Sequence, residues 1–188
     1  AEHLQEYLLG KIPGLLVVPE QPGREVEDHA FVKAHQPREG LGIADIHAVI
    51  GAMDPLPGAR AFLDRARERM QVLILSDTFY EFARPLMRQL GLPTLFCHSL
   101  VVDDDGMIAD YRLRMPEQKR EAVTRLKELN FRVVAAGDSY NDTAMLAEAH
   151  AGILFHPPEN VIREFPQFPV TRSYDELRRE IDLAFAAG

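Results

Sequence analysis

The sequence is poor in cysteine, in basic charge and in long apolar runs. Cys97 is its single cysteine, so an intrachain disulfide is impossible, which suits a reducing, cytoplasmic location. Its 29 acidic residues outnumber 21 lysines and arginines, and the net charge of −8 argues against nucleic-acid and anionic-membrane partners. No apolar run approaches the roughly 18–20 residues of a membrane span, and the first ten residues do not resemble a signal peptide.

The chain is long enough for one ordinary domain with a small appendage, since it has 188 residues, of which 46% are hydrophobic. From Pro55 onward, helix-like stretches alternate with short apolar, strand-like stretches. The expected helices are 58–70, 79–90, 116–130, 141–149, 159–164 and 174–186. The expected strands are 72–75, 95–97, 131–136, 151–155 and 168–171. This alternation predicts an open, doubly wound α/β domain with a mainly parallel sheet.

A small β-hairpin is expected within this domain. Asp-Asp-Asp-Gly at 103–106 separates two β-prone pieces, 100–102 and 107–113, and Asp-Gly supplies the positive φ that tight turns need. Residues 1–54 are less regular. Gly14 to Val18 is strand-like, 19–40 is rich in proline, glycine and charge, and 43–52 is expected to be helical. We therefore divide the chain into an N-terminal segment, 1–54, and an α/β core, 55–188.

Two polar loops follow expected strands, where open α/β sheets place their sites. The first is Ser76-Asp77-Thr78, whose hydroxyls precede an expected helix and are suited to binding an anion. Taken alone, capping of that helix by Ser76 or Thr78 is the simpler interpretation. The second loop contains Asp138 and Asp142, two hard oxygen ligands suited to Mg²⁺. Here a metal site is favoured over capping, because the loop holds more acids than a cap requires.

A third candidate is Lys119, which with Arg120 lies early in the expected helix that begins at Pro116. A cation near a helix N-terminus opposes the helix dipole, so its presence suggests another purpose, such as holding a phosphate. A solvated Lys/Arg pair is the alternative.

The order of these motifs resembles haloacid dehalogenase-type phosphatases. The stretches Leu75-Ser76-Asp77-Thr78-Phe79-Tyr80-Glu81-Phe82 and Ala136-Gly137-Asp138-Ser139-Tyr140-Asn141-Asp142, with Lys119 between them, resemble the phosphoserine phosphatase branch. That branch includes a bifunctional phosphoserine phosphatase/homoserine phosphotransferase. The resemblance covers about residues 41–185, including Pro55-Leu56-Pro57-Gly58.

The resemblance implies a Mg²⁺-dependent hydrolase of a small phosphorylated metabolite such as phosphoserine, with phosphotransfer to homoserine as a side activity and a homodimer as a further expectation. Ser76 and Lys119 would be catalytic, Ser76 binding the phosphoryl group and Lys119 neutralising its charge. Asp77, Thr78 and Asn141 would complete the phosphate site. Asp138 would ligate Mg²⁺ and Asp142 would support the metal.

The first motif of the family is not matched. Members begin with a strand that ends in Asp-x-Asp or Asp-x-Glu, whose first acid attacks phosphorus and whose second transfers protons. Here no aspartate precedes Asp28, and Ile12, Pro13 and Gly14 stand where the acids would be. Asp28 follows no strand, and Asp45 and Asp54 lie where the resemblance places the return from the cap to the core, so none of the three fits the nucleophile. Glu20 has no specific context, and the cap region is degenerate or incomplete.

Three explanations compete for this mismatch. The chain is a phosphatase core whose front, up to about residue 40, comes from a shifted reading frame or wrong start. Alternatively, it is an impaired homologue that binds Mg²⁺ and phosphorylated ligands without turnover, or its catalytic acid comes from an unexpected position. We favour the first, because the resemblance ends abruptly. A phospho-acceptor signalling domain is a weaker alternative, since its acidic pair is not visible.

Overall fold

The computed structural model describes residues 42–186, and the helices predicted between 43 and 186 are present there with changes of a few residues at their ends. The predicted strands are present as well, except that 95–97 and 100–102, which were predicted as separate pieces, belong to one continuous strand. The helices are α3 (Ile43–Gly51), α4 (Ala59–Arg67), α5 (Tyr80–Gln89), α6 (Gln118–Glu128), α7 (Tyr140–Glu148), α8 (Glu159–Glu164) and α9 (Tyr174–Ala186). The strands are β1 (Leu73–Phe79), β2 (Thr94–Val102), β3 (Ile108–Arg112), β4 (Val134–Gly137), β5 (Ala151–Phe155) and β6 (Val170–Thr171). The predicted α/β class is confirmed.

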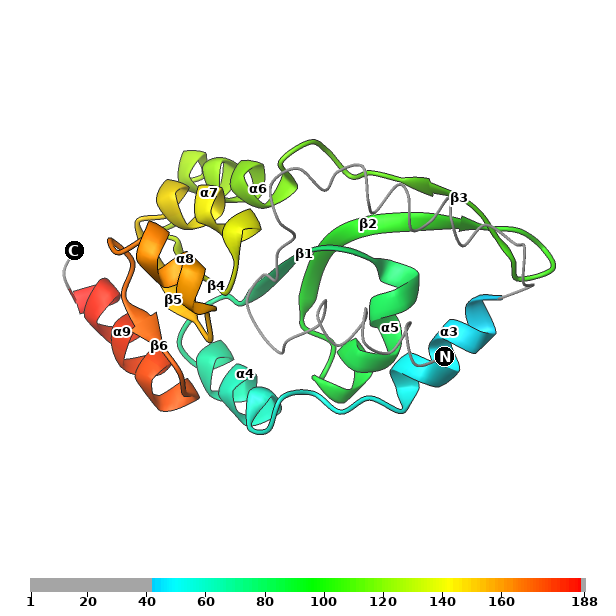
Figure 1. Cartoon of the computed structure of the whole chain (residues 1–188), viewed down its shortest axis with the longest axis horizontal. Coiled ribbons are helices and arrows are strands. Elements are labelled where there is room, and N and C mark those ends of the chain that lie inside the picture. The colour runs from blue at the N-terminus through cyan, green and yellow to red at the C-terminus, as the bar shows by residue number, and fades with distance from the viewer. Residues whose placement is uncertain (1–41, 187–188) are drawn as a thin grey trace.

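The strands form two three-stranded sheets in the described part of the chain, whereas the sequence predicted one. In the first sheet β1 is parallel to β2, and β2 is antiparallel to β3. In the second sheet β4, β5 and β6 are all parallel. Figure 1 shows the first sheet with α3 and α5 in one half of the molecule, and the second with α7, α8 and α9 in the other. The parallel pairing of the strands was therefore predicted correctly, but the prediction of one continuous sheet was not.

An apolar cavity of about 420 Å³ lies beside the strands β1 and β4 of the two sheets. Its lining includes Leu73 and Leu75 of β1 and Val134 and Ala136 of β4, with side chains of α4, α6 and α9 around them. The two strands form no ladder with each other in residues 42–186, although residues of both line this space.

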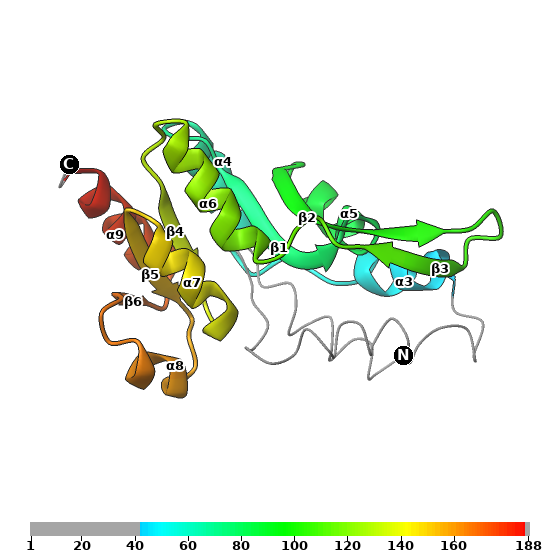
Figure 2. The same cartoon turned by 90° about the horizontal axis from the view of Figure 1, so that it is seen from above.

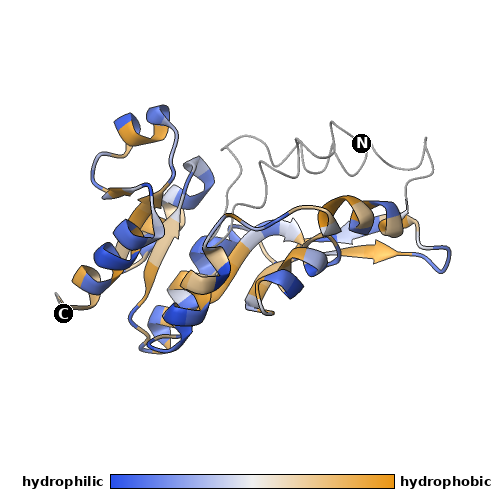
Figure 3. Ribbon diagram, turned by 90° about the horizontal axis from the view of Figure 1, so that it is seen from below, coloured by the Kyte–Doolittle hydropathy of each residue, from blue (hydrophilic) through white to orange (hydrophobic). Residues whose placement is uncertain are grey.

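One hydrophobic core nevertheless joins the two sheets. Leu63 of α4 and Leu86 of α5 belong to the same buried cluster as Ile153 of β5 and Leu177 of α9. Each of these side chains is almost completely buried, and such burial stabilises the fold by about 1.5–3 kcal/mol per side chain. In Figure 3 the strands are mostly hydrophobic, while the helices carry both hydrophilic and hydrophobic colour, as amphipathic helices do.

The predicted hairpin is formed by β2 and β3. In its loop the carboxylate of Asp103 accepts hydrogen bonds from the backbone N–H groups of Asp105, at 3.1 Å, and Met107, at 2.8 Å. Gly106 has a φ of 80°, the left-handed conformation for which Asp-Gly was expected. Gly42, the first described residue, forms a bridge with Met107 beside this loop.

The helix α3 packs against α5 and contributes Ile46 and Ile50 to the core. Figure 2 shows it beside the β2–β3 hairpin, at the end of the molecule opposite α9. The proposed division at residue 54 stays a prediction, because most of the N-terminal segment lies outside the described residues. None of the helices in residues 42–186 has the length and apolarity needed to cross a membrane.

Candidate active site

The first site loop is a bulge in a strand, not the turn that the sequence predicted. Strand β1 continues to Phe79, and α5 begins at the next residue. The ladder with β2 pairs Leu75 with Phe96 and then Phe79 with His98, so the three residues 76–78 stand opposite one. Such bulges redirect side chains next to functional sites. This one carries all three predicted phosphate-binding residues of the first loop.

The hydroxyl of Ser76 stabilises the bulge and does not cap α5. Its Oγ accepts a hydrogen bond from the backbone N–H of Thr78 at 3.3 Å. The cap position of α5 is occupied by Phe79, which makes no side-chain cap hydrogen bond. Ser76 is buried, with 7% of its surface exposed, at the carboxyl end of the regular part of β1.

The second loop connects β4 to α7, and Asp142 organises it. Its Oδ2 accepts hydrogen bonds from the backbone N–H groups of Asp138, at 2.8 Å, and Ser139, at 3.5 Å. A carboxylate in the first turn satisfies N–H groups that a helix start otherwise leaves unpaired. In the structure the fully buried Asp142 performs this task.

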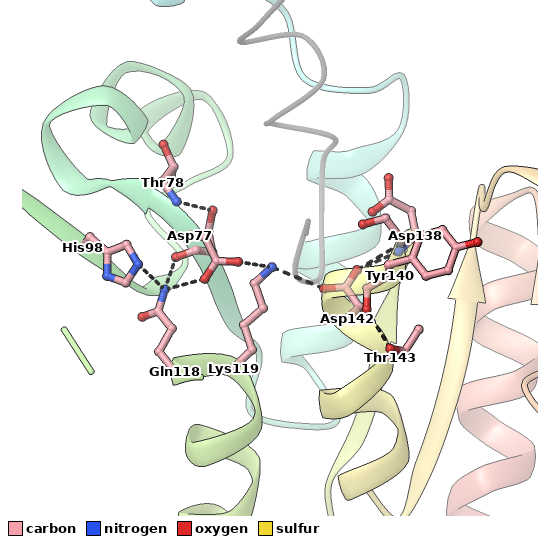
Figure 4. A network of polar contacts seen from close by, with 11 residues as sticks. Asp77, Thr78, His98, Gln118, Lys119, Asp138, Tyr140, Asp142 and Thr143 are labelled. Carbon is pink, nitrogen blue, oxygen red and sulfur yellow. Dashed lines mark hydrogen bonds and ion pairs between the residues drawn. The ribbon is translucent and has the colours of Figure 1, made fainter. Parts of the chain in front are cut away.

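Lys119 of α6 joins the two loops. Its Nζ lies 2.7 Å from Oδ2 of Asp77 and 3.4 Å from Oδ1 of Asp142, and only 5% of its side chain is exposed. Figure 4 shows the ammonium group between the two carboxylates, with Asp138 beyond Asp142. Arg120, in contrast, pairs with Glu117 and Glu121 on the surface of α6, so the solvated-pair alternative fits Arg120 and not Lys119.

Gln118 is a site neighbour that the sequence analysis missed. It is the first residue of α6, it is 4% exposed, and its Nε2 donates to the backbone carbonyl of Ser76 at 2.6 Å and to Oδ1 of Asp77 at 3.1 Å. Its only sequence signal was its place beside Lys119, because a glutamine at a helix start is ordinarily exposed.

The structure thus brings together five of the predicted site residues through consecutive contacts. They are Ser76, Asp77, Lys119, Asp138 and Asp142. Thr78 joins them through Ser76. Asn141 lies half-buried in the first turn of α7, close to them in the chain. The roles of all seven residues stay predictions.

The candidates of the N-terminal segment are only partly visible. Glu20, Asp28 and the expected strand 14–18 lie outside the described residues. Asp45 caps α3, because its Oδ2 accepts from the backbone N–H of Gly42 at 2.9 Å. Asp54 is exposed.

The acids of the site carry more negative charge than Lys119 neutralises. Burial raises the pKa of Asp138 to about 6, and Lys119 offsets only part of this effect. Burial also raises the pKa of Asp142 well above its usual range, again against the influence of Lys119. Oδ1 of Asp138 is buried without a hydrogen-bond partner among the described residues. A cation bound here would therefore relieve an unpaired, poorly solvated carboxylate.

These residues fit Mg²⁺. In phosphate-handling sites this ion is commonly held by one or two carboxylates together with water and phosphate oxygens, so a dedicated cage of protein ligands is not needed. In keeping with this, residues 42–186 contain no group of three or more His, Cys, Asp or Glu side chains placed to hold a metal. Asp138 is the better direct ligand, because both oxygens of Asp142 already accept hydrogen bonds.

Comparison with known proteins extends over most of the chain. The family model for haloacid dehalogenase-like hydrolases matches residues 7–150. Phosphoserine phosphatase ThrH of Pseudomonas aeruginosa is 55% identical over 169 residues, which cover 90% of this chain and 78% of that protein. A phosphoserine phosphatase of Pseudomonas syringae pv. tomato is 54% identical over 169 residues, covering 90% of this chain and 67% of that protein.

Solved structures agree on the fold. A phospho-aspartyl intermediate analogue of phosphoserine phosphatase has a TM-score of 0.65 and 22% identity, covering 82% of this chain and 76% of that one. A phosphoserine phosphatase from T. onnurineus in complex with NDSB-201 has a TM-score of 0.59 and 20% identity, covering 92% of this chain and 94% of that one.

The matches also reach beyond the point where the resemblance was expected to end. The family model begins at residue 7, and a match to 90% of the chain must include part of residues 1–41. The expectation that all likeness stops near residue 40 is therefore wrong, which weakens the shifted-frame explanation. With a family model that spans most of its length and relatives that share more than half of its aligned residues, this chain belongs to the haloacid dehalogenase-like hydrolases.

Proposed function

We propose that the protein is a Mg²⁺-dependent phosphoserine phosphatase. The names of its Pseudomonas relatives support the substrate, and their identity of 54–55% supports a shared chemistry. The observation that carries the proposal is the position of Lys119, whose buried ammonium lies between the bulge of β1 and the acids that follow β4. Phosphoryl transfer needs such fixed positive charge more than it needs covalent chemistry.

Six of the seven predicted site residues have a direct task in this proposal. The hydroxyl of Ser76 donates to a phosphoryl oxygen, and Thr78 and Asn141 complete the phosphate contacts. Lys119 neutralises charge that develops on the phosphoryl group. Asp138 holds Mg²⁺ with Asp142 behind it, and the bound ion supplies further positive charge to the phosphoryl oxygens.

The mismatch of the first motif motivates a second candidate function. No aspartate precedes Asp28, so a chain of this sequence is also consistent with a protein that binds Mg²⁺ and phosphorylated ligands without turnover. The two functions differ in whether phosphate is released. They share the same binding site, so a binding measurement alone does not separate them.

One assay decides between the two candidates. The purified chain is incubated with Mg²⁺ and phosphoserine, and released phosphate is measured. Release that Asp138→Asn abolishes supports the phosphatase. Absence of release, with Mg²⁺-dependent phosphoserine binding by calorimetry, supports the binding protein. Absence of both contradicts both candidates.

The remaining expectations need their own measurements. Phosphotransfer to homoserine predicts that phosphohomoserine forms when homoserine is added to the assay. A homodimer predicts twice the chain's 21.2 kDa mass by light scattering. A cytoplasmic location predicts recovery in the cytosolic fraction of cells that produce the protein.

A further inference from the structure

Gln118 and Lys119 are consecutive residues at the start of α6, and both are buried, with 4% of each exposed. Consecutive residues of a helix point in different directions, so α6 can bury both only because its first turn lies against the bulge of β1 and the start of α7. Glu117 before them has φ 46° and ψ 39°, a left-handed conformation that is costly for a residue other than glycine. The start of α6 is thus held in one particular orientation.

The contacts of Gln118 point to the element that holds it. Its Nε2 donates to the carbonyl of Ser76 at 2.6 Å and to Oδ1 of Asp77 at 3.1 Å, and it also lies 3.5 Å from Nε2 of His98 on β2. Its Oε1 has no hydrogen-bond partner within residues 42–186. A buried amide that leaves its oxygen unpaired is fixed by what its nitrogen contacts, and the two shorter contacts here, to Ser76 and Asp77, offset the cost of burying it. Gln118 therefore ties the helix to the bulge.

Asp77 transmits this contact to Lys119. The carboxylate of an aspartate rotates easily about its last bond, and here the amide of Gln118 holds Oδ1 while Oδ2 pairs with Nζ of Lys119 at 2.7 Å. A lysine has a long, flexible stem, so its acceptors determine where the ammonium group lies. If the carboxylate of Asp77 were no longer held in place, the ammonium group of Lys119 would move toward Asp142 and away from the bulge.

Asp77 is unsuited to bind phosphate itself. An ionised carboxylate only accepts hydrogen bonds, and a phosphate oxygen carries negative charge as well. We propose that Gln118 is a positioning residue, which fixes Asp77 and through it holds the ammonium group of Lys119 at the bulge. This inference rests on the proposed function, since Lys119 acts on the phosphoryl group there, and it gives Asp77 the same positioning role.

Gln118→Met tests the inference, because methionine keeps the length of the side chain but cannot donate. The matched control is Gln89→Met, since Nε2 of Gln89 also donates to a backbone carbonyl, that of Met53 at 2.8 Å, but far from the site. With phosphoserine and Mg²⁺, Gln118→Met should lower kcat roughly ten- to hundredfold, with KM little changed. Gln89→Met should leave both constants unchanged. A rise in KM with kcat unchanged, or an equal fall of kcat in Gln89→Met, would overturn the inference.

A double-mutant cycle separates positioning from an independent role. If Gln118 acts through Asp77, the double variant Gln118→Met with Asp77→Asn turns over no more slowly than the slower single variant. If the two losses multiply, the inference is wrong. If the wild type shows no turnover, the cycle uses the affinity of the four proteins for tungstate, an oxyanion that stands in for phosphate. Calorimetry in the presence of Mg²⁺ measures this affinity.

The failure of the proposed function remains distinguishable from the failure of this inference. Absence of both turnover and tungstate binding contradicts the proposed function. In that case the cycle is read from urea unfolding of the same four proteins, which needs no ligand. Non-additive changes in stability support the Gln118–Asp77 coupling, and additive changes overturn it.

Discussion

The ammonium nitrogen of Lys119 lies 3.4 Å from Oδ1 of Asp142, a carboxylate with no exposed surface. The other oxygen of Asp142 holds the backbone at the start of α7, so one buried side chain fixes both a helix start and a cation. The desolvation of such a pair is costly, and the arrangement persists only while each partner remains. This contact therefore links the stability of the fold to the chemistry of the site.

Lys119→Met should damage both activity and stability. Turnover of phosphoserine should fall at least a hundredfold, because a fixed positive charge at the phosphoryl group is lost. Loss of the buried cation should cost on the order of 3 kcal/mol in the free energy of unfolding at neutral pH. The control is Lys127→Met, whose partner Glu148 lies 2.7 Å away in a partly exposed pair, so its loss should change stability much less. Phosphate release and urea unfolding measure the two effects, and equal behaviour of the two variants would contradict the expectation.

Asp138→Asn should weaken Mg²⁺ binding about 10- to 100-fold, because it replaces a half-buried carboxylate by a neutral amide. The buried Oδ1 of that carboxylate has no hydrogen-bond partner in the described chain. Calorimetric titration with Mg²⁺ measures the affinity. Asp110→Asn is the control, since its carboxylate is exposed and accepts a hydrogen bond from the N–H of Tyr111 in β3. Unchanged affinity in Asp138→Asn would place the metal elsewhere.

The raised pKa of Asp138 predicts opposite effects of pH on stability and on metal binding. Without metal, the folded protein keeps a proton on Asp138 up to about pH 6, whereas the unfolded chain loses it near pH 3.8. The folded state then binds more protons, so its stability should fall as pH rises through this interval. Mg²⁺ binds the ionised form, so its affinity should rise about tenfold per pH unit below pH 6 and then level off.

Unfolding in urea at pH 5 and pH 7.5, with and without Mg²⁺, measures both effects. Added Mg²⁺ should stabilise the protein more at pH 7.5 than at pH 5. In Asp138→Asn the dependence should be smaller, though not absent, because burial raises the pKa of Asp142 in the same direction. A metal effect of equal size at both pH values would show that Asp138 is already ionised at pH 5.

Much of the fold could be predicted because apolar runs and breakers are local signals. Strand β5 was predicted with its observed bounds, Ala151 to Phe155, since a continuous apolar run ends before His156 and Pro157. The bulge at 76–78 could not be predicted in the same way. Its polar residues suggested a turn, and only their pairing with β2, a non-local contact, shows that the strand continues to Phe79.

Most residues of the site could be predicted from the sequence, but the contacts between them could not. Lys119 was identified because a cation is unfavourable at a helix start, and its burial gives that anomaly a cause. Gln118 has no such anomaly in the sequence. Which acid caps α7 also depended on geometry, since Asp138 and Asp142 are both plausible by type, and only the direction of the side chains distinguishes them.

Gly137, the last residue of β4, should tolerate no side chain. A Cβ atom added there would lie 2.2 Å from Oδ2 of Asp142, so Gly137→Ala must displace the carboxylate that holds the start of α7. We expect a loss of about 1–3 kcal/mol in the free energy of unfolding from this overlap. Mg²⁺ affinity should fall as well, because Oδ2 of Asp142 accepts a hydrogen bond from the backbone N–H of Asp138 and so holds this residue in place.

The matched control is Gly51→Ala at the end of α3, where a Cβ atom would meet no atom of residues 42–186 within 4 Å. Since alanine restricts the unfolded chain and favours helix, this variant should gain about 0.4–1 kcal/mol. Urea unfolding of both variants measures the difference in sign, and calorimetry with Mg²⁺ measures the effect on the site. If Gly137→Ala kept the metal affinity of the wild type, Asp142 would be free to move without disturbing Asp138, and its supporting role would be wrong.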